Sequence, residues 1–229
     1  MKLKAGIILG TGLETWEGER TEVITPCGPP SSPIVTSGNA MFLLRHGINH
    51  QFPPSRIPYK ANLLALKQLG VGRVISVCSV GSLDRVINPG SFCVPEQLVD
   101  FTKGRDSSFS EIGKVMHISF WNPFSPILRE LLGNILKSLG LPCHMGGTYI
   151  AVEGPAFSTQ AESRMYRLLG GSIIGMTACP EAQLARELGL DYALLCCVTD
   201  YDGKASFEEI QEMSRKFQVY LTEIVGVFK

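Results

Sequence analysis

The 229-residue sequence lacks two features that define large classes of proteins, long apolar runs and an excess of one charge. No apolar run reaches the roughly 18 residues that a membrane-spanning helix needs, so we expect no contact with a membrane. Because 21 basic residues balance 21 acidic ones without any block of like charge, no nucleic-acid-binding surface is expected. The first apolar stretch, Ile7-Ile8-Leu9 before Gly10, is too short for a secretion signal. We therefore expect a soluble, cytoplasmic protein.

The sequence also lacks the cysteine and histidine spacings that hold metal ions or build disulfide frameworks. Its seven cysteines are odd in number, contain no C-x-x-C pair and lie mostly in apolar segments, which predicts reduced, buried thiols. His46 and His50 are four residues apart, but Gly47, Pro53 and Pro54 disfavour the helix that would make them a pair of metal ligands. We therefore expect no metal site.

No internal repeat, low-complexity tract or linker interrupts the chain, and short apolar strands alternate with helical segments. This alternation is typical of an α/β protein, and we expect a single domain over residues 1–229. The segment 103–122 has no clean period, and loops of such length are often functional or interfacial. The expected strands cover residues 5–9, 34–36, 41–45, 73–79, 91–95, 148–152, 173–176 and 191–199, and the expected helices cover 58–69, 126–139, 159–169, 180–188 and 207–225.

A glycine-rich turn, Gly10-Thr11-Gly12, follows the first expected strand. Exposed backbone N–H groups and a threonine hydroxyl at such a place can hold a phosphate group. The turn is not a dinucleotide-binding fingerprint, because Thr15 stands where the third glycine belongs, and no Gly-Lys-Ser/Thr follows to make a P-loop. A plain tight turn is the alternative interpretation.

Three further strand ends carry side chains suited to an anion or a flat ring. Arg45 offers a planar charged fork for phosphate, and His46 adds a donor beside it. Thr177, after Met176, places a hydroxyl near the N–H groups that open the next helix. Phe157 lies in a strand-to-helix loop, where it can stack on a planar base or, alternatively, fill the core.

Two carboxylates, Asp200 and Asp202, come directly after the buried strand that ends near Thr199. Ligands of α/β proteins collect at the carboxyl ends of strands, so these side chains are candidates for reading a donor–acceptor edge or giving up a proton. A turn that simply ends the strand is the alternative. Together, the strand-end residues predict an α/β enzyme that handles phosphate and a planar ligand.

These motifs resemble the trimeric purine nucleoside phosphorylase family, and within it the 5′-methylthioadenosine phosphorylase branch. The matching pieces run in family order over residues 5–203 and are Gly10-Thr11-Gly12-Leu13-Glu14, Arg45-His46-Gly47, Tyr59-x-Ala61-Asn62-x-x-Ala65-Leu66, Gly81-Ser82-Leu83, Glu153-Gly154-Pro155-x-Phe157-Ser158, Met176-Thr177-x-x-Pro180-Glu181 and Thr199-Asp200-Tyr201-Asp202. The segments 52–57 and 93–98 are closer to the methylthioinosine-type bacterial enzymes.

The resemblance implies one phosphorylase domain, a mixed, twisted and partly barrel-like central sheet flanked by helices. It implies a pentosyltransferase in which phosphate attacks C1′ of a purine nucleoside, most simply 5′-methylthioadenosine, and releases the free purine and a ribose 1-phosphate. Phosphate is a co-substrate, and no cofactor is implied. The family assembly is a homotrimer or a dimer of trimers.

The resemblance also assigns residues. The phosphate positions fall on Thr11, Arg45, His46, Cys78, Ser79 and Thr177, and the nucleoside positions fall on Phe157, Ser158, Met176, Asp200, Tyr201 and Asp202. Asp200 and Asp202 are the catalytic candidates, Asp200 as the proton donor to purine N7 and Asp202 as the partner of a 6-amino group. His117 resembles a residue that reaches the 5′ pocket of a neighbouring subunit.

The exact substrate has alternatives at this point. An ionised carboxylate at the base edge repels the O6 of a 6-oxopurine, so the two aspartates favour a 6-aminopurine. A 6-oxopurine nucleoside or 5′-methylthioinosine on the same scaffold is the first alternative. A non-catalytic nucleoside-binding relative is the second, and a hydrolase is disfavoured because the phosphate positions Arg45, His46 and Thr177 are present.

Overall fold

The computed structural model describes residues 4–12, 16–202 and 204–228. Leu13, Glu14 and Thr15, which bear on the glycine-rich motif, therefore lie outside the described residues. The strands are β1 (Lys4–Leu9), β2 (Glu19–Thr21), β3 (Ile34–Ser37), β4 (Ala40–Leu44), β5 (Val71–Ser82), β6 (Phe92–Val94), β7 (Gln97–Asp100), β8 (Cys143–Met145), β9 (Thr148–Ala151), β10 (Ile173–Gly175) and β11 (Asp191–Tyr201). The helices are α1 (Tyr59–Gln68), α2 (Pro126–Ser138), α3 (Gln160–Leu168), α4 (Ala178–Glu187) and α5 (Phe207–Gly226), with a 3₁₀ turn at Pro54–Arg56.

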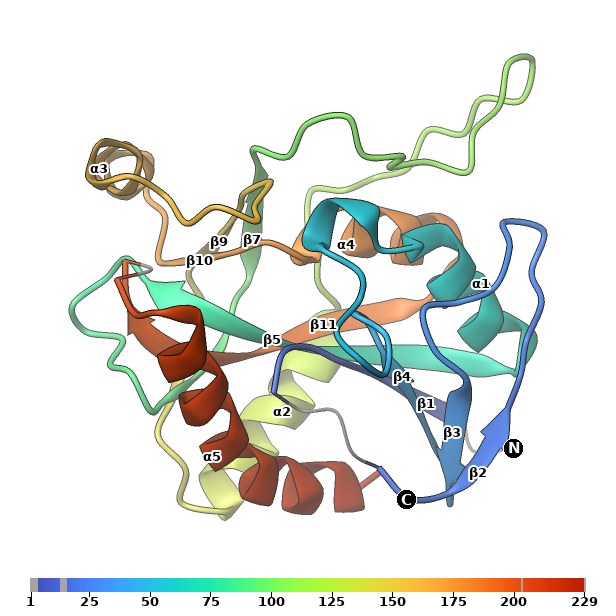
Figure 1. The fold of residues 1–229 in the computed structure, drawn as a ribbon, viewed down its shortest axis with the longest axis horizontal. Helices are drawn as coiled ribbons and strands as arrows, with labels where there is room; N and C mark the ends of the chain where they lie inside the picture. Colours follow the sequence, from blue (N-terminus) through green and yellow to red (C-terminus); the bar gives the residue numbers. More distant parts are fainter. Residues whose placement is uncertain (1–3, 13–15, 203, 229) are drawn as a thin grey trace.

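The strands form one mixed sheet with β5 as its branch point (Figure 1). β5 pairs in parallel with β1 and β11 and antiparallel with β10. One arm continues through β1 to β4, β3 and β2, and another continues through β10 to β9 and β7. β11 also pairs with β6, which in turn pairs with β8. Because β1, β4, β5 and β11 are mutually parallel, their carboxyl ends meet at one edge of the sheet.

Both faces of the sheet are covered by helices, which is why β11 is apolar and buried from Tyr192 to Val198. Leu194, Cys196 and Val198 point into the cluster that contains α1 and α4. Leu195 and Cys197 point into the opposite cluster, which contains α2 and α5. The strand therefore alternates between two cores rather than between core and water. The predicted mixed sheet flanked by helices is confirmed.

Most predicted elements are present, and the differences concern short strands and strand ends. β2, β7 and β8 were not predicted, because strands of three or four residues with partly exposed side chains lack a readable apolar alternation. α4 begins at Ala178, ahead of the predicted Pro180, and carries a non-helical residue at Cys179. The predicted loop 103–122 contains only one isolated bridge, between Glu111 and Lys114, and projects away from the sheet (Figure 1).

The predicted state of the cysteines agrees with the structure within the described residues. All seven thiols are free, and five of them are buried: Cys78, Cys93, Cys179, Cys196 and Cys197. Burial raises the pKa of Cys93 to about 12 and that of Cys143 to about 11, so these thiols stay protonated and unreactive. No helix in the described part of the chain is long and apolar enough to cross a bilayer.

Candidate active site

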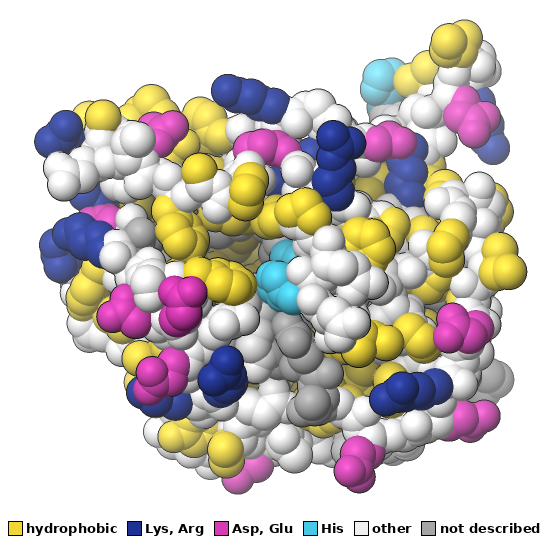
Figure 2. All heavy atoms as spheres, viewed as in Figure 1, with side chains coloured by type: hydrophobic (Ala, Val, Ile, Leu, Met, Phe, Trp, Pro, Cys, Tyr) yellow, Lys and Arg dark blue, Asp and Glu magenta, His cyan; other side chains and the backbone are white. Residues whose placement is uncertain are grey.

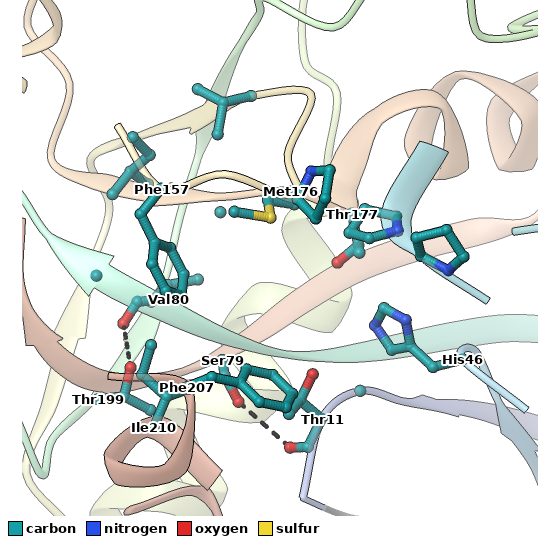
Figure 3. A pocket seen from close by; sticks show the side chains of 18 of the residues that line it. Thr11, His46, Ser79, Val80, Phe157, Met176, Thr177, Thr199, Phe207 and Ile210 are labelled. Atoms are coloured by element: carbon teal, nitrogen blue, oxygen red, sulfur yellow. Dashed lines mark hydrogen bonds between the residues drawn. The ribbon is translucent and has the colours of Figure 1, made fainter. Parts of the chain in front are cut away.

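A cavity of about 440 Å³ opens at the sheet edge where the parallel strands end. Figure 2 shows a hollow on this face, with histidine and hydrophobic side chains gathered at its rim. In Figure 3, Phe157 and Met176 face Phe207 and Ile210 across the cavity, while Thr11, Thr177 and His46 lie toward one end. The cavity thus has a polar end and an apolar middle, as expected for a small-molecule site.

Hydroxyl groups and a glycine turn form the polar end of the cavity. Thr11 follows β1, Ser79 lies within β5, and Thr177 follows β10, so three separate strands bring these hydroxyls together. The Ser79 hydroxyl lies 2.7 Å from the Ser214 hydroxyl of α5 and 3.4 Å from the Thr11 carbonyl oxygen. The Thr177 side chain does not cap α4, and because its oxygen accepts a hydrogen bond from Arg45, its O–H can donate to a ligand. Hydroxyl donors in this arrangement suit an inorganic phosphate.

Arg45 is the buried cation behind this polar end, and it is held by a buried carboxylate. Its Nε donates to Glu181 Oε2 at 3.0 Å, and its Nη1 donates to the Thr177 hydroxyl at 3.2 Å. Glu181 also accepts a hydrogen bond from the Tyr192 hydroxyl at 2.8 Å. Burial, the largest single effect, would lower the pKa of Arg45, but Glu181 together with Cys78 and Tyr192 outweighs it and holds the pKa above its usual value. Arg45 is therefore permanently charged and aims the Thr177 oxygen.

His46 is neutral, because burial and then the charge of Arg45 lower its pKa from 6.5 to about 3. Its Nδ1 lies 2.8 Å from the Phe52 carbonyl oxygen, which can only accept, so Nδ1 carries the proton. The neutral ring therefore offers an unprotonated Nε2. In this state His46 is an acceptor, suited to the P–OH of a hydrogen phosphate, whereas the sequence analysis expected a donor. The His46 ring also stacks on His50 at 4.3 Å.

The stacking loop, residues 153–158, joins β9 to α3 and carries Phe157 and Ser158 into the cavity wall. Gly154 has a φ of 64°, and a Cβ there would collide with the Met176 sulfur, so glycine is required for the close approach. Phe157 remains 42% exposed, which argues against its being a core aromatic. Its ring is thus presented to the cavity, where a flat base could stack on it.

Arg105 clamps the stacking loop to the strand end that carries Met176. Its side chain is 3% exposed and pairs with the Glu153 carboxylate at 3.2 Å. Its guanidinium also donates to the carbonyl oxygens of Glu153 at 2.7 Å, Met176 at 2.7 Å and Cys179 at 2.6 Å. One cation therefore fixes two loops of the site relative to each other. The sequence analysis missed Arg105 because it lies in a segment without periodicity.

Asp200 and Asp202 both line the cavity, but Asp200 lies within β11 rather than after it. The strand runs on to Tyr201 because a register shift between Val198 and Asp200 inserts Thr199 as an extra residue. Bulges of this kind re-aim side chains and are common beside active sites. The Thr199 hydroxyl lies 3.1 Å from the Asp200 carboxylate. The expectation that β11 ends at Thr199 was therefore wrong, although both carboxylates do reach the cavity.

Three of the candidate residues do not line the cavity. Cys78 lies behind it, with its sulfur 3.5 Å from the Thr177 hydroxyl. The Tyr201 hydroxyl donates to Asn88 at 2.6 Å, and its ring lies under Arg85. His117 is exposed in the projecting loop.

Several cavity residues were given no role in ligand binding by the sequence analysis. Pro53, Pro54, Phe207 and Ile210 add an apolar wall, of which the last two come from α5, and His50 also lines the cavity. Ser206 caps the N-terminus of α5 through a capping box with Glu209, a sequence signal that the sequence analysis did not use. In the described part of the chain, no cluster of three or more His, Cys, Asp or Glu residues is placed to hold a metal ion.

The α/β fold and the cavity at the sheet edge define a small-molecule enzyme, and comparison with protein families shows which family it belongs to. A model described as the phosphorylase superfamily matches residues 4–226. The chain therefore belongs to the phosphorylase superfamily, as its motifs predicted.

Individual relatives narrow the similarity further. The chain is 46% identical over 205 residues to an S-methyl-5′-thioadenosine phosphorylase of Thermococcus kodakarensis, covering 87% of this chain and 79% of that protein. It is 45% identical over 206 residues to the enzyme of that name from Mycolicibacterium smegmatis, covering 86% and 77%. A mutant adenosine/methylthioadenosine phosphorylase of Schistosoma mansoni in complex with methylthioadenosine superposes with a TM-score of 0.92 at 34% identity, covering 98% of this chain and 89% of that one.

Proposed function

We propose that this protein cleaves 5′-methylthioadenosine with inorganic phosphate, releasing adenine and 5-methylthioribose 1-phosphate. The observation that carries the proposal is one cavity that joins three hydroxyls, a stacking aromatic and two carboxylates. The relatives named S-methyl-5′-thioadenosine phosphorylase support the same substrate.

Each part of the cavity has a task in this reaction. Phosphate binds at Thr11, Ser79 and Thr177, with Arg45 and Glu181 behind them and Cys78 as a further buried neighbour. Met176 lies beneath the ribose, and the purine stacks on Phe157 beside Ser158. The bound phosphate then sits next to C1′, where positive charge develops as the glycosidic bond breaks.

The leaving purine requires a proton because its anion is a poor leaving group. We assign that proton transfer to Asp200, which is buried at the base end and 3.1 Å from the Thr199 hydroxyl. Asp202 accepts a hydrogen bond from the 6-amino group of the purine. Phosphate displaces the purine without any metal or organic cofactor in this scheme.

The assembly and location belong to the same proposal. We infer that residues 1–229 act as one phosphorylase domain, and that a homotrimer or dimer of trimers brings His117 to the cavity of a neighbouring subunit. The loop carrying His117 also exposes Ile112, Val115, Met116 and Trp121, which an interface would cover. The free thiols of the described residues are consistent with the reducing cytoplasm.

Initial rates with four nucleosides test the substrate. Methylthioadenosine, methylthioinosine, adenosine and inosine differ pairwise at the 6-position and the 5′-position. We expect methylthioadenosine to have the highest kcat/KM. Equal or higher rates with methylthioinosine would replace the proposal by the 6-oxopurine alternative, and absence of turnover with all four would favour a non-catalytic nucleoside-binding protein.

A further inference from the structure

An ion pair joins the two elements that enclose the base end of the cavity. Arg167 of α3 pairs through Nη1 with Asp202 Oδ1, just beyond the end of β11. Lys204 Nζ lies 3.6 Å from the other carboxylate oxygen. The Asp202 side chain is 9% exposed, so both cations act on a largely desolvated carboxylate. This base-edge ion pair is not explained by the roles assigned above.

Both partners are held by their own elements. α3 begins with a capping box between Thr159 and Glu162, and Tyr166 anchors it against Phe101 with ring centroids 5.2 Å apart. Arg167 is the next residue along the helix. Asp202 has a φ of 61°, and its N–H donates to the Ser82 carbonyl oxygen at 2.9 Å. The fold thus fixes the backbone of both partners, while the Arg167 side chain, 38% exposed, reaches Asp202 from the outer side.

Asp202 forms part of the wall between two cavities. It lines the nucleoside cavity, and it also lines a second cavity of about 350 Å³ on the side of α3. Ser158 is the other residue that belongs to both. The basic side chains Arg164, Arg167 and Lys204 all line the second cavity. The carboxylate therefore has cations behind it and the base site in front.

An ionised carboxylate can only accept hydrogen bonds, whereas a protonated one can also donate. An acceptor-only group at the base edge binds an amino group and repels a carbonyl oxygen. A site with a fixed polar partner discriminates strongly against the analogue that leaves it unpaired.

We propose that Arg167 is a specificity-determining residue, which orients the Asp202 carboxylate as a hydrogen-bond acceptor facing the 6-position of the purine and so selects 6-aminopurines over 6-oxopurines. The inference rests on the proposed function, because it assigns the base end of the cavity to a purine. Arg167 acts through Asp202 and does not itself touch the substrate, so it is a positioning residue.

The experiment compares kcat/KM for methylthioadenosine and methylthioinosine in the wild type and in Arg167→Met, Arg167→Lys and Arg164→Met. We expect Arg167→Met to lower the 6-amino to 6-oxo ratio at least tenfold and Arg167→Lys to restore most of it. Arg164→Met is the matched control, because it removes the same charge from the same helix and second cavity but pairs with no acidic residue in the described structure. It should leave the ratio unchanged.

A second variant separates specificity from folding. In an Asp202→Asn background, adding Arg167→Met should produce no further change in the ratio, since the charge that Arg167 acts on is gone. The inference is overturned if Arg167→Met keeps the wild-type ratio, if Arg164→Met shifts it equally, or if the shift persists in the Asp202→Asn background.

Calorimetric measurement of the affinities for free adenine and hypoxanthine distinguishes a failure of this inference from a failure of the proposed function. If the wild type turns over no nucleoside, the phosphorylase proposal fails, yet the adenine to hypoxanthine affinity ratio still reports on the ion pair. We expect that ratio to fall at least tenfold in Arg167→Met. An unchanged affinity ratio would refute the role of Arg167.

Discussion

At the scale of single residues, burial decides the charge of His46. Its pKa is lowered from 6.5 to about 3, first by burial and then by Arg45. The unfolded chain therefore takes up a proton below pH 6.5 that the folded protein refuses until about pH 3. Folding stability is complete above pH 6.5 and falls as the pH drops through this window.

This linkage gives a measurable prediction. Lowering the pH from 7 to 5 should cost about 2 kcal/mol more unfolding free energy in the wild type than in His46→Gln. Urea unfolding at the two pH values measures the difference. Identical pH dependences in the wild type and His46→Gln would show that His46 is not buried in its neutral form.

The charge of Asp200 carries the second residue-scale prediction. Asp200→Asn keeps the shape of the side chain but cannot protonate N7, so kcat/KM for methylthioadenosine should fall by about 100-fold or more. The preference should shift toward 6-oxopurines, because the amide N–H group beside N7 can donate a hydrogen bond to the adjacent O6. Steady-state kinetics on both substrates measure this. Asp191→Asn, at the exposed opposite end of β11, should change neither value. Wild-type kinetics in Asp200→Asn would remove Asp200 from the mechanism.

At the scale of elements, Arg105 links a loop without secondary structure to two strand ends of the site. Arg105→Met should lower kcat/KM by about 100-fold, because carbonyl oxygens that it fixes, at Glu153, Met176 and Cys179, can then shift. Asp106→Asn is the matched control, since it breaks the neighbouring Lys60 pair of the same loop on the surface. Equal losses in both variants would mean that the loop as a whole, and not Arg105, supports the site.

Residues that directly follow strands were the part of the site that could be predicted from the sequence. Thr11 and Arg45 follow the neighbouring parallel strands β1 and β4, whose carboxyl ends meet at one edge, so their proximity follows from the pattern. Thr177 follows β10, which runs antiparallel to β5, so only the fold shows that it joins them. The bulge at Thr199 could not be predicted, because it depends on the register between β11 and β5. Neither segment carries a local sequence pattern that indicates such a contact.

The roles of the residues that support the site could not be predicted, because they also depend on contacts between distant segments. Glu181 stands in a motif that was recognised, yet its role depends on Arg45, 136 positions away in sequence. Arg105 lies in the segment 103–122, where no period indicates an element. Phe207 and Ile210 lie in the first turn of a helix that was predicted, but only the fold places that helix over the cavity.

At the scale of the whole molecule, the projecting loop predicts an assembly in which His117 completes a neighbour's cavity. Sedimentation velocity should give a trimer or hexamer. His117→Ala should weaken methylthioadenosine turnover by about tenfold, the typical loss of one buried hydrogen bond. Lys114→Ala in the same loop serves as the control and should behave as the wild type. A fully active monomer would contradict the role of His117.

The central claim is that phosphate, and not water, attacks C1′ of the nucleoside in the cavity at the sheet edge. Phosphorus-31 NMR of the protein with methylthioadenosine and inorganic phosphate tests it most directly. The account predicts one sugar 1-phosphate for each adenine released, and no adenine release when phosphate is omitted. Adenine release that proceeds equally without phosphate, or without any sugar phosphate, would contradict it.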